Sequence, residues 1–300
     1  MCRGGLSCRI LPTDTGRLDN FLLSVLPGVS RSQIANAIKN GDILLNGRTV
    51  KAGYDLRAGD EITGGIAQHA VTAEPEEMDL DIVYEDKHLM IINKPRGLTV
   101  HPGAGVKRGT LLNGLLGRSG TDKLERAGIV HRLDKNTAGL LVVAKTAEAQ
   151  SRLGEMFESH AIKRTYIGIV EGRVKGNITI DKNIIRHPNH RVLFTTADSG
   201  GRRAVTHLTV AEQFAKYTLC RFELETGRTH QIRVHCKSMN HPLVGDPEYN
   251  PNGTIKNLPG QMLEAIKLEF LHPMTKDDIK VEIPPSKQLT DTINKCKHIK

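Results

Sequence analysis

Apolar residues recur at helical spacing in two stretches near the start of the chain. The first stretch spans residues 17–26, and the second follows the break at Pro27-Gly28. Ser30 is a suitable N-cap for the second helix, which we expect to end at Asn40-Gly41. The apolar face of the first predicted helix is formed by Leu18, Phe21, Leu22 and Val25, and that of the second by Ile34, Ala37 and Ile38.

Short strands and turns complete this first segment. The dipeptide Asn46-Gly47 is typical of a tight hairpin turn, and it lies between strand-like runs at 43–45 and 49–51. A turn at 58–60 then leads to a further strand at 61–62. These elements predict a small α/β module. The pattern alone is equally typical of an ordinary structural unit with a solvated basic face.

Strand-like apolar runs dominate the rest of the chain, with only a few helices between them. One such helix is predicted at 152–160, where Leu153, Met156, Phe157 and His160 share a face. The spacing of the strands is too irregular for a repeating βαβ unit, so we predict an α+β fold with a mixed sheet. The predicted strands lie at 89–93, 140–144, 166–170, 219–224 and 265–270.

A third helix is predicted over the stretch that begins at Thr229, its expected N-cap. Ile232, His235, Cys236 and Met239 form an apolar stripe at helical spacing, and Arg233 faces away from that stripe. Asn240 and Pro242 are expected to end the helix, because asparagine tolerates the left-handed conformation and proline cannot continue a helix.

Composition limits the class of protein. The chain has 300 residues, enough for two domains, and 38% of them are hydrophobic. No apolar run approaches the roughly 18 residues of a membrane span, and the N-terminus lacks the apolar core of a secretory signal. The five cysteines form no CxxC pair, which argues against a disulfide scaffold and a cysteine-rich zinc site. We therefore expect a cytoplasmic protein without a membrane segment.

The net charge of +9 is unevenly distributed. Residues 1–65 carry eight basic and six acidic side chains, residues 66–90 carry one and seven, and residues 91–300 carry 33 and 20. The acidic segment, which also contains Gly64-Gly65 and Pro75 at or near its ends, suits a linker. We therefore predict domains at 1–75 and 76–300. The basic excess of the larger domain is compatible with a polyanionic partner.

Candidate chemistry concentrates in three stretches: 89–103, 128–146 and 224–246. In the middle one, a polar turn holds Asp134 between apolar runs, close to Arg132 and Lys135. Such an aspartate can cap a turn or form a salt bridge, or it can be an ionised carboxylate that acts as nucleophile or base. The residues alone leave both possibilities open.

Other kinds of site are poorly supported. His230 and His235 are five residues apart, which places them on different helix faces, so we predict no metal site and interpret His235 as a packing residue. A glycosidase would usually need a second carboxylate, and Glu125 and Glu148, the nearest to Asp134 in sequence, match no motif. Gly227 is interpreted as a turn glycine.

Two regions resemble known families. The run RLDNFLLSVLPGVSRSQIANAIKNGDILLNGRTVKAGYDLRAGDEI resembles the S4 domain, a small RNA-binding fold. HRLDKNTAGLLVVAK resembles the catalytic motif of the RluA-type pseudouridine synthases, and NKPRGLTVHP, KRTYIGIVEG, GRTHQIRVH and HPLVGD resemble their other motifs, in the family's order. An S4-like domain followed by this catalytic domain is similar to the RluD-like subgroup. The resemblance implies a catalytic domain built on a mixed, largely antiparallel sheet.

The resemblance also implies roles for individual residues. Asp134 would be the essential carboxylate, and whether it attacks the sugar or abstracts a ribose proton stays open. Arg132 would help to fill the space left by a flipped uridine, and Tyr166 would lie against the uracil ring. Arg233 would pair with Asp134 and favour its ionised form. No metal and no organic cofactor are needed for this redox-neutral isomerisation.

The implied partner is RNA, namely 23S ribosomal RNA or a large-subunit precursor, and we expect a monomer with no membrane association. Which uridine is modified cannot be read from the sequence. The alternative is a non-catalytic RNA-binding or ribosome-assembly factor that keeps the fold. The intact set of Asp134, Tyr166 and Arg233 favours the enzyme.

Overall fold

The computed structural model describes residues 6–10, 16–26, 31–65, 73–103, 105–118, 120–122, 124–190 and 192–299, and it gives 6–9 and 31–33 by their backbone alone. The chain forms two compact units, Met1–Thr72 and Ala73–Lys300. Each unit has its own hydrophobic core.

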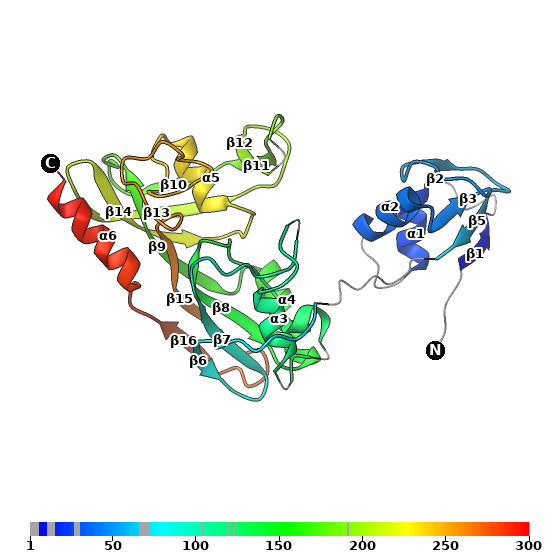
Figure 1. Cartoon of the computed structure of the whole chain (residues 1–300), viewed down its shortest axis with the longest axis horizontal. Coiled ribbons are helices and arrows are strands. Elements are labelled where there is room, and N and C mark those ends of the chain that lie inside the picture. Colours follow the sequence, from blue (N-terminus) through cyan, green and yellow to red (C-terminus); the bar gives the residue numbers. More distant parts are fainter. Residues whose placement is uncertain are drawn as a thin grey trace. The chain divides into compact units, whose positions relative to one another are not determined.

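The first unit packs two helices on a small antiparallel sheet (Figure 1). Helices α1 (Leu18–Val25) and α2 (Arg31–Asn40) agree with the sequence prediction, and the expected cap Ser30 lies outside the described residues. Leu18, Leu22, Ile34 and Ile38 are buried between the helices and the sheet. The strands are β1 (Leu6–Arg9), β5 (Glu61–Gly64) and β3 (Ile43–Leu45), and β2 (Gly16–Arg17) pairs with β4 (Asp55–Leu56).

The strand predicted at 49–51 is wrong. Asn46 and Gly47 do form the tight turn, with positive φ at both residues and reciprocal hydrogen bonds between Leu45 and Arg48. Beyond Arg48 the chain leaves the hairpin, and Thr49 and Lys51 are exposed. The strand at 43–45 pairs instead with β5, and the next strand along the chain, β4, buries Leu56 and pairs with β2.

The second unit is built on a nine-stranded sheet, which is largely antiparallel as expected. Among the described strands, only β8 and β15 pair in parallel. The order is β10 (Ile178–Asp181), β13 (Val205–Gln213), β14 (Tyr217–Leu224), β9 (Lys163–Glu171), β15 (Leu263–Leu271), β8 (Ala138–Ala144), β7 (Leu89–Lys94) and β6 (Ile82–Glu85), and β16 (Asp278–Glu282) also pairs with β15. A separate hairpin joins β11 (Asn183–Arg186) to β12 (Phe194–Ala197).

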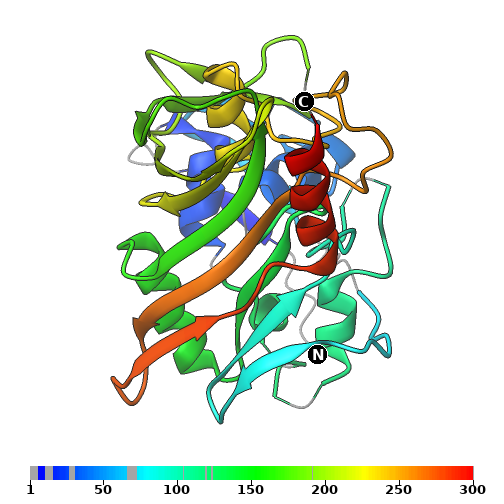
Figure 2. The same ribbon diagram turned by 90° about the vertical axis from the view of Figure 1, so that its left-hand side faces the viewer.

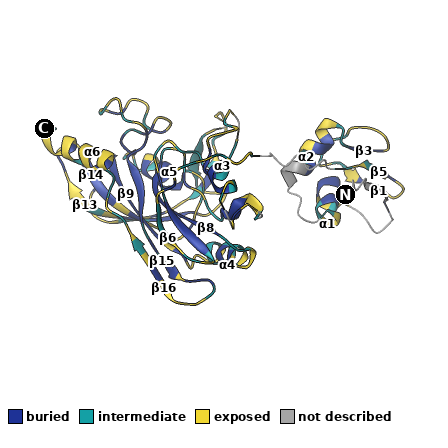
Figure 3. Ribbon diagram, turned by 60° about the horizontal axis from the view of Figure 1, so that its bottom comes forward, coloured by how far each residue is buried: buried dark blue, intermediate teal, exposed yellow. Residues whose placement is uncertain are grey.

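Helices cover both faces of this sheet, and the central strands are almost wholly buried (Figure 3). Helices α3 (Leu111–Leu116) and α5 (Gln231–Ser238) pack on the face that carries Leu141, Tyr166 and Phe222. Helices α4 (Ala147–Glu158) and α6 (Lys287–His298) pack on strand residues that alternate with these. The alternation of side chains along each strand therefore separates two cores.

The acidic segment and the C-terminal tail differ from expectation. Backbone and side-chain hydrogen bonds join Glu74 and Glu76 to Asn113 of α3, so the second half of the predicted linker packs on the second unit. The sequence KQLTDTINKCKHIK at the C-terminus predicts a frayed helix on the surface. This prediction is wrong, because α6 buries Leu289 and Cys296 and lies along the sheet (Figure 2). No helix within the described part of the chain is long and apolar enough to cross a membrane.

Candidate active site

Asp134 lies in the turn that precedes strand β8. Ile129 pairs with Val143 of β8, and the chain reverses through a hydrogen bond from the Thr137 N–H to the Asp134 carbonyl, 3.1 Å long. Apolar runs on both sides of the turn are buried in the sheet, which leaves the polar residues at its tip. The Asp134 side chain is 16% exposed, so the carboxylate faces a recess and not open solvent.

Arg233 of α5 connects Asp134 to two further carboxylates. Its Nη1 atom donates to Asp134 Oδ2 at 3.2 Å, and its Nε and Nη2 atoms donate to Asp246 at 2.7 and 2.8 Å. Nη2 also donates to Glu248 Oε2 at 2.6 Å. The Arg233 side chain is only 4% exposed, so this pairing with Asp134 takes place inside the protein.

The charge of Arg233 is secured by its neighbours. Burial acts to lower the pKa of Arg233, but the hydrogen bonds and charge of Asp246, with the charges of Asp134 and Glu248, raise that pKa well above its ordinary value. The guanidinium also lies over the ring of Tyr249, with 4.8 Å from Cζ to the ring centre. A permanent cation therefore faces the Asp134 carboxylate.

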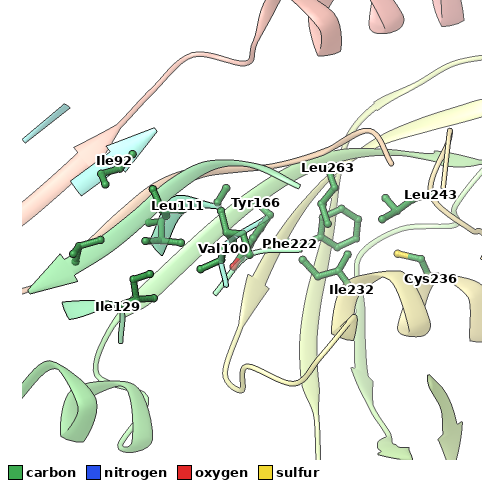
Figure 4. Close-up of a cluster of buried hydrophobic side chains, with 14 of the residues drawn as sticks. Ile92, Val100, Leu111, Ile129, Tyr166, Phe222, Ile232, Cys236, Leu243 and Leu263 are labelled. Carbon is green, nitrogen blue, oxygen red and sulfur yellow. The ribbon is translucent and has the colours of Figure 1, made fainter. Parts of the chain in front are cut away.

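Tyr166 forms the apolar wall of the same recess. It lies on β9 among Val100, Phe222 and Leu263 (Figure 4), and it is 6% exposed. Ile167 and Ile169 belong to the opposite core, because successive side chains of a strand point to opposite faces. Burial raises the pKa of Tyr166, so the phenol stays neutral at physiological pH.

The structure brings all four predicted site residues to one place. Arg132, Asp134, Tyr166 and Arg233 line a small cavity of about 60 Å³, together with Ile232 and Leu263. Arg132 is exposed, and it forms no side-chain hydrogen bond or ion pair with another described residue. It also lines two larger adjoining cavities, of about 480 and 210 Å³, that share Asp134.

The start of α5 differs from the prediction. The N-cap residue is His230, in the left-handed conformation (φ 56°), and not Thr229. Gln231 fixes this end of the helix: its side chain donates to the Val205 carbonyl and accepts from the Arg228 N–H. At the other end, Asn240 adopts a positive φ of 61°, as expected for a helix terminator.

His230 is a site residue that the sequence interpretation did not identify. Its Nε2 atom lies 3.9 Å from Asp134 Oδ1, and its Nδ1 atom lies 2.9 Å from the Tyr249 hydroxyl. That hydroxyl also accepts the Phe194 N–H at 2.9 Å, and its own proton can be donated to His230 Nδ1. Burial lowers the pKa of His230, against the opposing charge of Asp134. In the neutral tautomer that accepts from Tyr249 at Nδ1, the ring presents an N–H at Nε2 toward the carboxylate.

The buried side chains of Lys94 and Arg96 hold the backbone around the Asp134 turn. Lys94 donates to the carbonyls of Pro95, Leu98 and Lys135 at 2.9 to 3.1 Å. Arg96 donates to the carbonyls of Asn136 and Gln261 and pairs with Glu264 at 2.9 Å. Lys94 is fully buried, and burial lowers its pKa to about 7. Lys135 and Asn136, the two residues that follow Asp134, are therefore bound to the end of β7 and the loop after it.

Asp246, His230 and Lys94 lie within the motifs quoted above, but the sequence pattern assigns them no role at the site. Asp246 closes the stretch HPLVGD, His230 lies in GRTHQIRVH, and Lys94 begins a Lys-Pro pair. Their contact with the site depends on loop paths, which hydrophobic periodicity does not report. His235 is buried against Thr206, consistent with its interpretation as a packing residue.

The described residues show no cluster of three or more His, Cys, Asp or Glu side chains that could hold a metal ion. Cys220, Cys236 and Cys296 are buried free thiols, and burial raises the pKa of each. The chemistry available at the site is that of a largely buried carboxylate with a fixed guanidinium, an apolar wall and an exposed arginine.

Comparison with known proteins agrees with this arrangement. The RNA pseudouridylate synthase family model matches residues 88–238, and the S4 domain model matches residues 16–62. The chain belongs to the RNA pseudouridylate synthase family and is an RNA pseudouridine synthase, with an N-terminal S4 domain.

Relatives of similar length support the assignment. An uncharacterized RNA pseudouridine synthase of Bacillus subtilis is 42% identical and covers 92% of this chain and 93% of its own. The ribosomal large subunit pseudouridine synthase D of Escherichia coli is 41% identical over 92% of this chain and 89% of its own. That of Xanthomonas campestris is 40% identical over 91% and 86%.

Solved structures show the same fold. The structure titled human RNA pseudouridylate synthase domain containing 1 matches 75% of this chain and 98% of its own, with a TM-score of 0.56 at 23% identity. The corresponding structure of domain containing 4 matches 72% and 92%, with a TM-score of 0.58 at 20% identity.

Proposed function

We propose that this protein converts specific uridines to pseudouridine in large-subunit ribosomal RNA, with Asp134 as the essential carboxylate. The observation that carries the proposal is the pairing of Asp134 with Arg233 inside a recess whose apolar wall is Tyr166. The relatives named ribosomal large subunit pseudouridine synthase D, which cover most of the chain, support this RNA as the substrate.

The target uridine enters the site by flipping out of its helix. Extruding a base costs a few kcal/mol, which contacts with the backbone and pocket must offset. Arg132 is next but one to Asp134, exposed, and without an ion pair among the described residues. Its guanidinium is available to occupy the space that the base leaves in the RNA stack.

The reaction breaks the N1–C1′ bond of the uridine and forms a C5–C1′ bond, while C5 loses a proton and N1 gains one. Asp134 begins it either by attacking C1′ or by taking a ribose proton, and both routes need an ionised carboxylate with a free oxygen. Arg233 holds Oδ2, so Oδ1 is the oxygen left toward the cavity. The ring of Tyr166 packs against the uracil and excludes water from the detached base.

The test compares wild type with Asp134→Asn in a strain that lacks the gene. Pseudouridine is mapped at single-nucleotide resolution on 23S ribosomal RNA. We expect wild type to restore one or a few sites and Asp134→Asn to restore none, while both proteins bind the RNA equally well. Identical maps for the two proteins would show that Asp134 is not catalytic and would favour the assembly-factor alternative.

The S4 domain adds to RNA binding in this proposal, and we place the protein in the cytoplasm as a monomer. Removing residues 1–65 should weaken the affinity for 23S RNA and make it less dependent on salt, because fewer phosphate contacts release fewer counterions. An unchanged affinity and salt slope in the truncated protein would remove the RNA-binding role of this domain.

A further inference from the structure

Arg164 is a buried arginine without a carboxylate partner. It lies on β9, two residues before Tyr166, and is 7% exposed. Within the described part of the chain its side chain forms no ion pair, and the one side-chain hydrogen bond runs from Nη2 to the Thr226 carbonyl at 3.3 Å. The Nε atom is buried with no partner. A buried cation of this kind is costly unless an anion joins it.

The surroundings of Arg164 hold its guanidinium in one position. The group lies over the ring of Phe157, with 5.6 Å from Cζ to the ring centre, and Phe157 stacks on His131 at 4.3 Å. A Cβ atom at Gly227 would lie 2.8 Å from Arg164 Nη1. The φ of Gly227 is not positive, so the sequence interpretation of a turn glycine is incomplete: the missing side chain makes room for Arg164.

This guanidinium lines the cavity of about 480 Å³ that begins at Asp134. Arg132 and Arg228 line the same cavity, so three arginines face two carboxylates, those of Asp134 and Glu158. Asp134 is already paired with Arg233, and Glu158 makes no ion pair with a described residue. The space is therefore cationic, wide enough for a charged group, and continuous with the site of the reaction.

We propose that Arg164 binds a single backbone phosphate of the RNA, next to the nucleotide that enters the Asp134 site. A planar guanidinium with unused N–H groups suits an oxyanion of this geometry, and the phosphate supplies the missing counterion. This inference rests on the proposed function for the identity of the RNA. It adds a defined anion site, held by Phe157 and Gly227, to the general positive charge of the domain.

The test measures binding of a 23S stem-loop that wild type modifies, using Asp134→Asn protein so that the RNA stays unchanged. Each phosphate near the target uridine is replaced in turn by an uncharged methylphosphonate. We expect one position at which this replacement weakens binding about 10-fold or more, as loss of a charged hydrogen bond does. The protein that carries both Asp134→Asn and Arg164→Gln should bind the unmodified RNA as weakly as the Asp134→Asn protein binds the RNA with the methylphosphonate. The methylphosphonate should not weaken binding to the double variant any further.

Salt dependence gives a second readout. The slope of log affinity against log salt should fall by about one for Arg164→Gln. It should not change for Arg152→Gln, because Arg152 lies on α4 and is already paired with Glu148 at 2.7 Å. Arg164→Lys keeps a charge but not the planar fork, and it should recover the slope with only part of the affinity.

Two results would overturn the inference. One is a methylphosphonate effect that is as large in Arg164→Gln as in the protein with Arg164, and the other is an unchanged salt slope. Circular dichroism and thermal unfolding of each variant identify a loss of fold. If wild type modifies no uridine, the proposed function fails, and the salt slope measured on whole 23S RNA still decides whether Arg164 binds phosphate.

Discussion

The guanidinium of Arg233 donates to Asp134 and Asp246 at the same time, at 3.2 Å through Nη1 and at 2.7 and 2.8 Å through Nε and Nη2. Asp246 is fully buried and also accepts the backbone N–H groups of Glu248 and Tyr249. It therefore fixes the plane in which Arg233 meets the reactive carboxylate. The geometry of Asp134 depends on a residue more than one hundred positions away in the chain.

Asp246→Asn should reduce both stability and activity. The change leaves Arg233 buried with part of its counter-charge removed, and breaking one partner of a buried pair costs about 3–5 kcal/mol. We expect the free energy of unfolding in urea to fall by this amount. The rate of pseudouridine formation should also fall, because Arg233 is no longer held in one orientation.

Glu248→Gln is the matched control for Asp246→Asn. Glu248 contacts the same guanidinium, but its side chain is 38% exposed, so water can replace it. The loss of stability should stay below about 1 kcal/mol. Equal losses in the two variants would mean that Asp246 has no special part in holding Arg233.

We expect the contribution of His230 to activity to depend on the N–H at its Nε2 atom. Glutamine can place an amide N–H near the position of Nε2, whereas asparagine reaches only to the position of Nδ1. We therefore expect His230→Gln to keep more activity than His230→Asn. The expected order of stability is the reverse, because residue 230 has a φ of 56° and asparagine tolerates that conformation better.

The two orders separate the explanations for His230. Thermal unfolding and single-turnover rates are measured on both variants and on Tyr249→Phe, which removes the hydroxyl that faces Nδ1. If activity follows stability, with the asparagine variant higher in both, His230 is only a backbone cap. If activity follows the reach of the donor, His230 positions Asp134 or the substrate.

Periodicity predicted the elements of this protein well and predicted part of the site. The alternation on β9 assigned Tyr166 and Ile167 to opposite faces, and the apolar stripe of α5 left Arg233 on the other side. Both are local properties, set by the backbone repeat of one element. Local pattern is therefore sufficient to place a side chain on a face.

The residues that contact a given face of a helix or strand are positioned by loops. Asp246 reaches Arg233 through an irregular segment after α5, and Arg164 of β9 meets Gly227 in the loop that follows the neighbouring strand β14, so neither contact follows from a repeat. The tail illustrates a different failure. Leu289 and Cys296 are seven positions apart on one helix face, a pattern typical of a packed helix, so the prediction of a frayed end is wrong.

Because of His131, the free energy of unfolding should decrease as the pH falls below about 6.5. Its Nε2 accepts the Val142 N–H at 2.8 Å, which requires the neutral ring, and burial lowers its pKa from 6.5 to about 3. Between these two values the unfolded chain binds more protons than the folded one, so stability is complete above pH 6.5 and is lost as the pH falls. At about pH 5 the loss from this residue should reach about 2 kcal/mol.

The comparison is between wild type and His131→Gln, whose amide oxygen can accept from Val142 without titrating. Urea unfolding at about pH 7.5 and about pH 5 gives the pH-dependent loss for each protein. The loss should be smaller in the glutamine variant by about 2 kcal/mol. An equal loss in both proteins would assign the acid sensitivity to other groups.

Glu264 connects the C-terminal helix to the active site, and Glu264→Gln should break this connection. Glu264 accepts from Arg96 at 2.9 Å, and it also accepts both the backbone N–H and the hydroxyl of Ser286, the N-cap of α6. Arg96 in turn donates to the Asn136 carbonyl, two residues after Asp134. Without the charge of Glu264, Arg96 is a buried cation with no carboxylate partner among the described residues, so we expect a loss of about 3–5 kcal/mol in unfolding free energy.

Activity should fall beyond what unfolding explains, because the turn that carries Asp134 loses its support at Asn136. The rate is therefore measured at a temperature where the variant is fully folded by circular dichroism. Glu269→Gln is the control: it lies on the same strand, and its pair with Lys267 is partly exposed, so the expected loss is below about 1 kcal/mol. A Glu264→Gln protein that is destabilised yet turns over at the wild-type rate would show that α6 stabilises the fold without positioning Asp134.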